Sequence, residues 1–320
     1  MKLKMKLFLH RAAKILLNKI GYSLISKISE KKKLDFNRDF RKDLSLENQK
    51  IVSVVFSKDR AMQLHAFLES YFENVMNYSR IVVLYKASNE EHAKSYEQLK
   101  DIFINCNVNF IEEISFRKQL IRIVSRLEED RILFYVDDMI FTHKFDYKLL
   151  DSVNPYTTIV SLSRGLDMTY SAVLLKDLKL PKFINAGKVL KQFHWSEIKE
   201  SSDWSYPLGV AGYLYSTKEI LSIFNNVDFK APNSLEGAMQ VFKSEFINRF
   251  GMCTENAIAV CVHANLVQTE GVNPILNNFT IEDLLEKWKS GEEIARDSFY
   301  AKPINITQKQ DYTFRERMKK

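Results

Sequence analysis

Between residues 51 and 141, short apolar runs alternate with segments in which apolar residues recur at spacings of three and four. The runs Ile51–Phe56, Ile81–Tyr85 and the one that begins at Arg131 are rich in β-branched and aromatic residues, which is typical of buried strands. The helical spacing is clearest between Ala61 and Val75. Strands that alternate with helices predict an α/β domain built on a largely parallel sheet.

The second half of the chain is less regular, and its elements are predicted from shorter signals. Gly165 suits a tight turn between two predicted strands. Ser234 is predicted to be the N-cap of a helix, with Glu236 in the first turn, where the helix dipole favours an anion. The elements expected here are strands at Thr158–Ser163, Thr169–Leu174 and Ala257–Val262, and helices from about Thr217, from Ser234 and over Ile281–Trp288.

Residues 1–33 are predicted to form a separate, basic amphipathic helix. Its apolar face would carry Met5, Leu9, Ala12, Leu16 and Ile20, and its opposite face Lys4, Arg11 and Lys14. Such a helix can lie in the interface of an anionic membrane, or it can dock on the domain or on a partner. We therefore expect three regions: the helix and a polar linker over 1–48, the α/β domain over 49–300, and a polar, basic tail over 301–320.

Composition narrows the class of protein. With 320 residues, 46% of them hydrophobic and 27% charged, the chain is long enough for a large globular core. The net charge of +7 and the pI near 9.0 suit a phosphate-rich ligand or an anionic membrane surface, and no nucleic-acid motif accompanies them. The three cysteines lack metal-ligand spacing, so neither a disulfide framework nor a zinc site is expected.

Missing motifs narrow the class further. No apolar run is long enough to span a bilayer, and the first residues lack the features of a secretory signal. We therefore expect a cytoplasmic protein that is peripheral on the inner face of the cytoplasmic membrane. Neither a Gly-rich phosphate loop nor a G-x-S-x-G motif occurs, which argues against a dinucleotide enzyme, a P-loop NTPase or a hydrolase of that architecture.

Asp137 and Asp138 directly follow an apolar strand and form the strongest candidate site. Ionised carboxylates at the end of a buried run must be paired, hydrogen-bonded or bound to a cation, and a divalent cation that chelates a phosphate is one such partner. Alternatively, the pair caps the turn that follows the strand. Ligands of open α/β sheets bind beyond the carboxyl ends of the strands, so we expect the pair to share one rim with Ser57–Arg60 and Tyr85–Ser88.

The second half adds candidates for the diphosphate and for a sugar acceptor. Arg164 can clamp a diphosphate bidentately, although an arginine at a turn is often a solvated surface residue. Asp203 lies beside Trp204 and Tyr206 in the sequence. Aromatic planes beside a carboxylate suit a sugar-binding groove, but ordinary core packing explains the same cluster equally well.

Five segments carry a family resemblance. They are Val54-Val-Phe-Ser-Lys-Asp-Arg60, Ile81-Val-Val-Leu-Tyr-Lys-Ala-Ser88, Ile132-Leu-Phe-Tyr-Val-Asp-Asp138, Asp203-Trp-Ser-Tyr-Pro-Leu208 and Pro232-Asn-Ser-Leu-Glu236. Together they resemble bacterial glycosyltransferases with a GT-A fold, similar to family 2, from about Ile51 to Ile294. The resemblance implies a Rossmann-like sheet flanked by helices, a nucleotide-sugar donor, and an acceptor side formed by the second half.

The resemblance also implies roles for single residues. Asp137 would serve the ribose and phosphate, and Asp138 would bind a divalent metal, Mn²⁺ or Mg²⁺, that neutralises charge on the leaving nucleoside diphosphate. Glu236, or else Asp203, would take the proton of the acceptor hydroxyl in an inverting reaction. Trp204 and Tyr206 would bind the acceptor. The expected nucleotide-sugar contacts are Phe56, Ser57, Asp59, Arg60, Lys86 and Asp137, with Arg164 added for the diphosphate.

The chain departs from the family pattern at two places. Met139 stands where related sequences tend to have a third aspartate, and Ala211-Gly212-Tyr213 stands where they tend to read Asp-Gly-His. The resemblance implies a hexosyl- or related glycosyltransferase that acts on a glycan or lipid-linked precursor of the lipopolysaccharide or capsule type. Because of these departures, a second interpretation stays open, in which the protein is a catalytically impaired partner in a glycan-assembly complex. A third interpretation, from another class, is a nucleotidyltransferase that acts on sugar phosphates.

Overall fold

The computed structural model describes residues 30–33, 35–36, 50–171, 174–265, 267, 279–301, 308–309 and 312–318. The chain divides into two compact units, Met1–Asp43 and Leu44–Lys320. In the first unit the described residues are helical, and the rest of the helix predicted over 1–33 lies outside the described residues. Within the described part of the chain, no helix has the length and apolar content needed to cross a bilayer.

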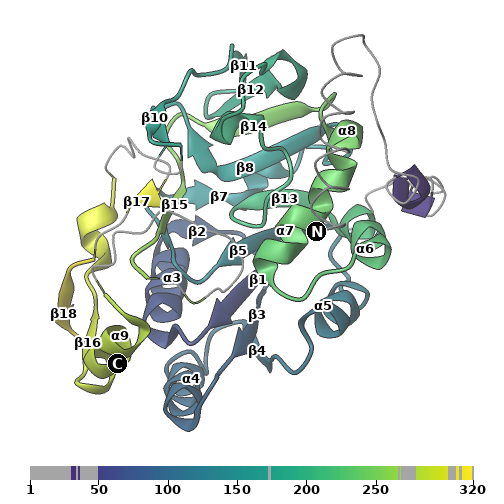
Figure 1. Cartoon of the computed structure of the whole chain (residues 1–320). Helices are drawn as coiled ribbons and strands as arrows, with labels where there is room; N and C mark the ends of the chain where they lie inside the picture. Colours follow the sequence, from purple (N-terminus) through teal and green to yellow (C-terminus); the bar gives the residue numbers. More distant parts are fainter. Residues whose placement is uncertain are drawn as a thin grey trace, which may run out of the picture. The chain divides into compact units, whose positions relative to one another are not determined.

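The second unit is built on a nine-stranded mixed sheet with the strand order β11-β12-β14-β8-β13-β5-β1-β3-β4 (Figure 1). β12 and β13 each run antiparallel to both of their neighbours, and the other strands all run in one direction. The predicted α/β fold with a mostly parallel sheet is therefore confirmed. The strands are β1 (Ile51–Lys58), β3 (Ile81–Lys86), β4 (Val108–Glu112), β5 (Arg131–Val136), β8 (Thr158–Gly165), β11 (Ile184–Ala186), β12 (Leu190–His194), β13 (Tyr213–Ser216) and β14 (Phe250–Thr254).

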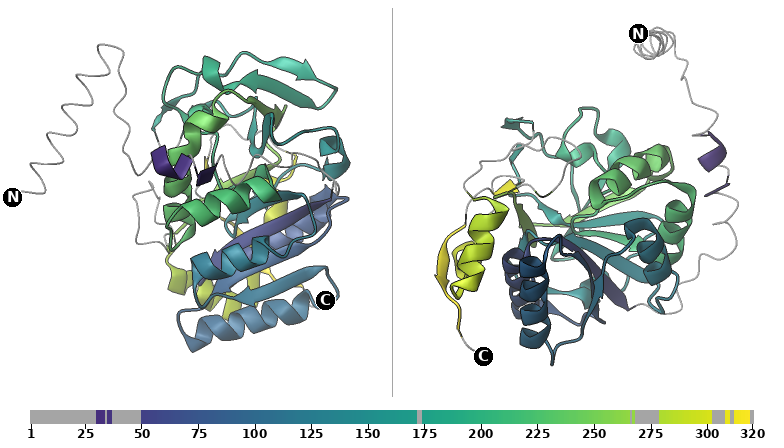
Figure 2. Two further views of the ribbon diagram at one scale, coloured as in Figure 1. Left: turned by 90° about the vertical axis from the view of Figure 1, so that its right-hand side faces the viewer. Right: turned by 60° about the horizontal axis from the view of Figure 1, so that its bottom comes forward.

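Helices cover both faces of this sheet (Figures 1 and 2). Crossovers between parallel strands are right-handed, so the helices after β1 and β3 lie on one face and the helix after β4, where the chain steps back to β5, lies on the other. Accordingly α3, α4 and α9 pack on one another, and α5 packs on α6. The helices are α3 (Ala61–Asn74), α4 (Glu90–Ile102), α5 (Phe116–Val124), α6 (Thr217–Asn226), α7 (Pro232–Met239), α8 (Lys243–Phe246) and α9 (Ile281–Lys289), with 3-10 turns η1 (Tyr147–Leu150), η2 (Trp195–Glu197), η3 (Asp203–Ser205), η4 (Gln240–Phe242) and η5 (Arg296–Phe299).

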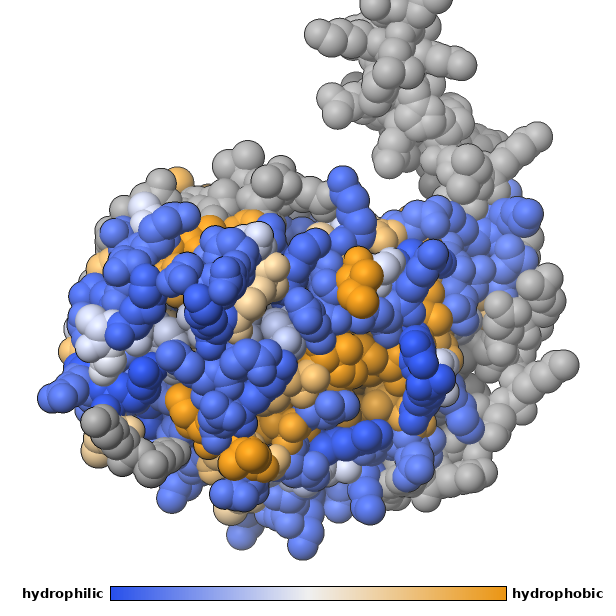
Figure 3. Space-filling model, turned by 90° about the horizontal axis from the view of Figure 1, so that it is seen from below, coloured by the Kyte–Doolittle hydropathy of each residue, from blue (hydrophilic) through white to orange (hydrophobic). Residues whose placement is uncertain are grey.

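β4 is the terminal strand at one end of the sheet, and Figure 3 views the molecule from this end. Polar side chains dominate the visible surface, and apolar side chains emerge between them. Ile104 and Ile114, which precede and follow β4 in the sequence, are 73% and 89% exposed.

A smaller sheet continues the chain beyond the two aspartates. β6 begins directly after Asp138 and pairs with β15, so that Met139 lies opposite Cys261. β17 pairs with the other edge of β15, and β18 pairs with β16, so these parts of the predicted polar tail pair with strands of the domain. The short strands are β2 (Val75–Met76), β6 (Met139–Phe141), β7 (Phe145–Asp146), β9 (Tyr170–Ser171), β10 (Lys176–Asp177), β15 (Ala259–Val262), β16 (Glu292–Ile294), β17 (Gln308–Lys309) and β18 (Phe314–Glu316).

The register of β1 brings the three predicted rim loops together. Phe56 pairs with Val136 on one side, and Ser57 pairs with Tyr85 on the other. The backbone N–H of Asp137 donates to Phe56 O at 3.1 Å, and that of Asp59 donates to Lys86 O at 3.0 Å. The expectation of one shared rim at the carboxyl ends of the strands is confirmed.

Two predicted elements differ from the structure. The helix near Ser234 begins at Pro232, and its N-cap is Ala231, so the prediction of Ser234 as N-cap is wrong. Proline at the first helical position is a start signal in its own right, since it has no N–H to satisfy. Consequently Glu236 lies beyond the first turn. The strand predicted over Thr169–Leu174 is limited, in the described residues, to Tyr170–Ser171.

An aromatic cluster fills the space between the end of the sheet and η3. Phe193 packs edge-on against both Trp195 and Trp204, with ring centroids 4.7 and 5.5 Å away. Gly251, on the neighbouring strand β14, makes room for the Phe193 ring, because a Cβ at this position would lie 2.1 Å from Phe193 Cζ. Both tryptophans are fully buried.

We predict that Gly251→Ala destabilises the protein by about 1–3 kcal/mol, because the added methyl group forces Phe193 into an already filled cluster. Gly237→Ala is the control. Nothing lies within 4 Å of a Cβ at Gly237, and alanine is the better helix former by up to about 1 kcal/mol. Urea unfolding of the two variants measures the difference, and equal free energies of unfolding would contradict the packing described here.

Candidate functional site

The carboxylate of Asp137 is held by three donors from the end of β1 and the loop that follows it. Ser57 Oγ donates to Asp137 Oδ2 at 2.8 Å, and the backbone N–H of Lys58 donates to the same oxygen at 3.2 Å. Arg60 Nη1 donates to Asp137 Oδ1 at 3.1 Å. Burial raises the pKa of Asp137 to about 6, although the charge of Arg60 and these hydrogen bonds pull it down. Asp137 therefore has no oxygen without a donor.

Arg60 joins both aspartates to the segment after β15. The same Nη1 that contacts Asp137 also donates to Asp138 Oδ2 at 2.9 Å, and Nη2 donates to the backbone oxygen of Asn265 at 2.6 Å. Burial alone would lower the pKa of Arg60, but the charges of the two aspartates outweigh it and raise the pKa above its usual value. In this structure the guanidinium, predicted to contact a nucleotide, positions the two carboxylates.

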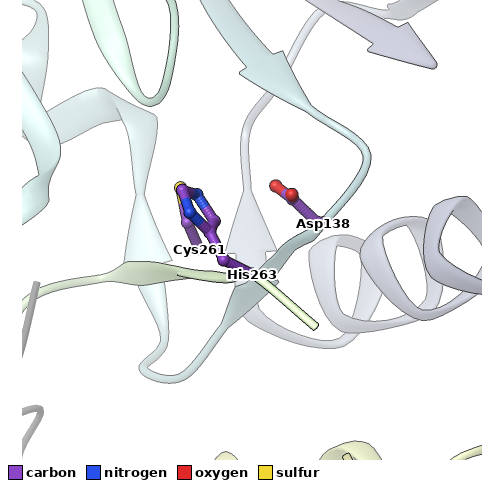
Figure 4. A group of neighbouring side chains, drawn as sticks. All are labelled: Asp138, Cys261 and His263. Atoms are coloured by element: carbon purple, nitrogen blue, oxygen red, sulfur yellow. The ribbon is translucent and has the colours of Figure 1, made fainter. Parts of the chain in front are cut away.

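Asp138 lies next to Cys261 and His263, and the ligand atoms of these three residues all lie within 4.8 Å of one another (Figure 4). Oδ2 of Asp138 is occupied by Arg60, whereas Oδ1 is buried without a hydrogen-bond partner. A buried carboxylate oxygen without a donor is costly. The space between Asp138 and His263 is therefore suited to a bound cation.

The chemistry of this donor set fits a divalent cation held by two of the three residues. Burial lowers the pKa of His263, so its imidazole is neutral near pH 7 and has a nitrogen lone pair to offer. Burial raises the pKa of the Cys261 thiol well above its usual value, and a thiol must lose its proton before it ligates a metal. Asp138 Oδ1 and His263 are thus the ligands to consider, and Cys261 is a neighbour.

Glu236, on α7, faces the same region. Its Oε1 accepts the backbone N–H of Val210 at 3.1 Å, and burial raises its pKa to about 6. After burial, the charges of Asp138 and Glu236 are the next causes of the raised pKa of Cys261. Cys261 is therefore close enough to both carboxylates to feel their charges, and the two carboxylates come from opposite halves of the chain.

Arg164 connects the elements around Glu236. Its Nη2 donates to the backbone oxygen of Asp203 at 2.8 Å and to Tyr213 Oη at 3.0 Å, while Tyr213 Oη donates to Tyr206 O at 3.0 Å. Oδ2 of Asp203 is buried without a partner. Arg164 is thus a structural link between β8, η3 and β13, and its positive charge lowers the pKa of Glu236.

Four other predicted residues have different surroundings. Phe56 packs between Phe116 and Phe134 in the core, at ring distances of 5.2 and 5.7 Å, which leaves its ring no surface for a nucleotide. Trp204 is fully buried, so core packing is the interpretation that fits it. The remaining two lie at the rim: Lys86, the last residue of β3, is exposed beside Glu113, and Asp59, at φ 55° in the loop after β1, accepts the backbone N–H of Ser88 at 2.7 Å.

Several residues of the site were not predicted from the sequence. Tyr96 contacts Ser57 Oγ at 2.7 Å and accepts the N–H of Arg60 at 3.2 Å, whereas its spacing in the sequence indicated only a helix. Cys261 and His263 alternate on and just after a strand, which puts both side chains on one face. Their spacing was the signal in the sequence that could have identified these two residues as neighbours. Tyr312, in the predicted tail, is buried and contacts Val262 O at 3.3 Å.

Part of the chain is similar in sequence to a known glycosyltransferase. No family model matches the chain. The chain is 28% identical to the bifunctional glycosyltransferase pgtA of Dictyostelium discoideum in an alignment 194 residues long, which covers 54% of this chain and 25% of that protein.

Solved structures give weaker matches. The S. aureus TarS 1–349 structure has a TM-score of 0.41 at 12% identity, covering 66% of this chain and 59% of that one. Its complex with UDP-GlcNAc has a TM-score of 0.44 at 14% identity, covering 70% and 60%. A nucleotidyl transferase from Methanothermobacter thermautotroptrophicus has a TM-score of 0.39 at 10% identity, covering 66% and 89%. The sequence similarity therefore relates about half of this chain to a quarter of a glycosyltransferase.

Proposed function

We propose that this chain is a nucleotide-sugar-dependent glycosyltransferase of the hexosyl or a related type. The observation that carries the proposal is the pair of carboxylate sites around Cys261: Asp138, with one oxygen free beside His263, and Glu236, with its raised pKa. The first suits a metal-bound diphosphate and the second suits a general base. The similarity to pgtA supports the same class of reaction.

The donor side is formed by the rim of β1 and β5. Asp138 Oδ1 and the neutral imidazole of His263 would hold a divalent cation, Mn²⁺ or Mg²⁺, whose charge stabilises the leaving nucleoside diphosphate. Arg60 fixes the other oxygen of Asp138, so the carboxylate cannot turn away. Met139, where a third carboxylate was expected, lies fully buried in β6 opposite Cys261. In this proposal His263 takes the place of that missing ligand.

The acceptor side supplies the base. As the acceptor hydroxyl oxygen forms a bond to the anomeric carbon, the bond from that carbon to the diphosphate oxygen breaks, and the hydroxyl proton passes to Glu236. Its Oε1 keeps the N–H of Val210, so Oε2 is the atom that takes the proton. Asp203, with its buried free oxygen, is the second candidate for this role.

The acceptor and location belong to the proposal as well. We infer a surface-glycan precursor of the lipopolysaccharide or capsule type, carried on a lipid, at the inner face of the cytoplasmic membrane. The basic pattern of residues 1–33 supports attachment to an anionic surface.

Asp138→Asn and His263→Ala are expected to remove the metal-dependent part of donor binding. In wild type, a nucleoside diphosphate with Mn²⁺ at about 100 times its Kd stabilises the fold by about 2.7 kcal/mol, and this gain should be small without the metal. A thermal-shift panel of nucleoside diphosphates, with and without Mn²⁺ or Mg²⁺, measures it. Glu236→Gln is the control and should keep the full gain. If no nucleoside diphosphate stabilises wild type, the proposed donor site is wrong.

Glu236→Gln is expected to lower kcat by about 10²–10⁴-fold while donor binding is kept, because the amide cannot take a proton. In wild type, the rate should rise as the pH increases through about 6 and then level off, because the pKa of Glu236 is about 6 and only its deprotonated form acts as base.

Release of nucleoside diphosphate in the presence of membrane lipid extract measures the rate at each pH. Asp203→Asn tests the second candidate base in the same assay. Donor binding without turnover in wild type would favour the alternative of a catalytically impaired partner protein.

A further inference from the structure

Four exposed apolar side chains belong to one short segment of the chain, and this segment includes the last strand at the end of the sheet opposite to β4. Among the described residues, nine large hydrophobic side chains are exposed, and four of them lie between positions 174 and 189. They are Leu174, Leu175, Ile184 and Val189, exposed by 42%, 71%, 49% and 41%. Ile184 belongs to β11, the last strand of the sheet, and β10, β11 and β12 lie at the same end of the molecule (Figure 1). The exposed large hydrophobic residues are therefore not evenly distributed along the described part of the chain.

The same segment of the chain is rich in lysine. Lys176, Lys179, Lys182 and Lys199 are all exposed and line one cavity of about 350 Å³, whose acidic lining residues are Asp177, Glu197 and Glu200. Residues 174–200 contain six lysines and three acidic residues, so three positive charges are in excess. Within the part of the chain that the structure describes, none of the four lining lysines forms a salt bridge.

We propose that this surface, formed by residues 174–202 and called here the lysine–leucine surface, docks on an anionic lipid bilayer. Protruding aliphatic side chains enter the boundary between headgroups and acyl chains, and the lysines contact the anionic headgroups. A protein partner fits less well, because the cores of protein interfaces are rich in aromatic residues and arginine and poor in lysine. This segment has no arginine, and Phe193 and Trp195 are buried.

The position of the lysine–leucine surface suggests what docking achieves. Ser202 lines the cavity, and the next residue, Asp203, is bound through its carbonyl by Arg164 beside Glu236. A bilayer on this surface would bring a lipid-carried acceptor close to the proposed base. This consequence rests on the proposed function, whereas docking itself does not.

Binding of the full-length chain to vesicles tests the proposal. Phosphatidylcholine vesicles that contain phosphatidylglycerol are compared with pure phosphatidylcholine vesicles by co-sedimentation. The triple variant Lys176→Glu, Lys179→Glu, Lys182→Glu should bind the anionic vesicles about tenfold or more weakly than wild type. The control Lys118→Glu, Lys144→Glu, Lys148→Glu changes the charge equally at exposed lysines elsewhere and should bind like wild type. To separate vesicle binding by this surface from binding by the helix predicted over residues 1–33, both triple variants are also measured with the added substitutions Lys4→Glu, Arg11→Glu and Lys14→Glu.

A second measurement reports insertion directly. Leu175→Cys in a Cys106→Ser background is labelled with an environment-sensitive dye, whose emission should shift to the blue and strengthen with anionic vesicles only. The same dye at Ile104→Cys, near the β4 end, should not respond.

Equal vesicle binding by the two triple variants, or an unchanged dye signal at Leu175→Cys, would overturn the proposal. If either result is found and the wild-type chain binds an acidic protein, the surface serves a protein partner. Failure of the donor site would leave both vesicle measurements unaffected, so the two proposals fail separately.

Discussion

The site depends on the burial of two adjacent carboxylates, which is possible only because Arg60 is buried with them. Removing charges from water costs several kcal/mol per ion, and breaking such a group by loss of one partner typically costs about 3–5 kcal/mol. The planar guanidinium reaches both aspartates and the backbone oxygen of Asn265 at once. One cation against two anions leaves one negative charge in excess. Burial is the main cause of the raised pKa of Asp137, and the charge of Asp138 adds to it. A cation bound at the unpaired Oδ1 of Asp138 would neutralise the excess negative charge.

Elements distant in sequence keep this group in place. α3 starts directly after Arg60, and Arg296 near the C-terminal end donates to Glu69 and Glu73 on that helix at 3.4 and 2.8 Å. Tyr312 packs beside the aspartates, whose charges add to burial in raising the pKa of its hydroxyl. Arg296 and Tyr312, both from the C-terminal part of the chain, are thus connected to α3 and to the surroundings of the aspartates. Mutations there are expected to act through α3 on the geometry of Arg60.

The sequence predicted the parts of the site that depend on local pattern. Apolar periodicity located β1, β3 and β5, and the rule that ligands bind at the carboxyl ends of strands brought Ser57, Asp59 and Asp137 together. Trp204 shows the limit, because an aromatic residue beside a carboxylate has the same local pattern whether its ring faces a groove or the core. His263 shows another limit: its contact with Asp138 exists because β15 pairs with β6, and strand pairing across about 120 residues leaves no local signal.

The pKa of Glu236 depends on the position of this residue along α7. In the first turn of the helix, the dipole would stabilise the carboxylate and hold its pKa down, but this effect falls off within one turn. Because the helix begins at Pro232, Glu236 lies beyond that range, and burial dominates, while the N–H of Val210 and the charge of Arg164 restrain the shift. The resulting pKa of about 6 leaves the carboxylate ionised at neutral pH, yet basic enough to take a proton. An acceptor that excludes water from the site would raise the pKa further, and so strengthen the base at the moment when it is needed.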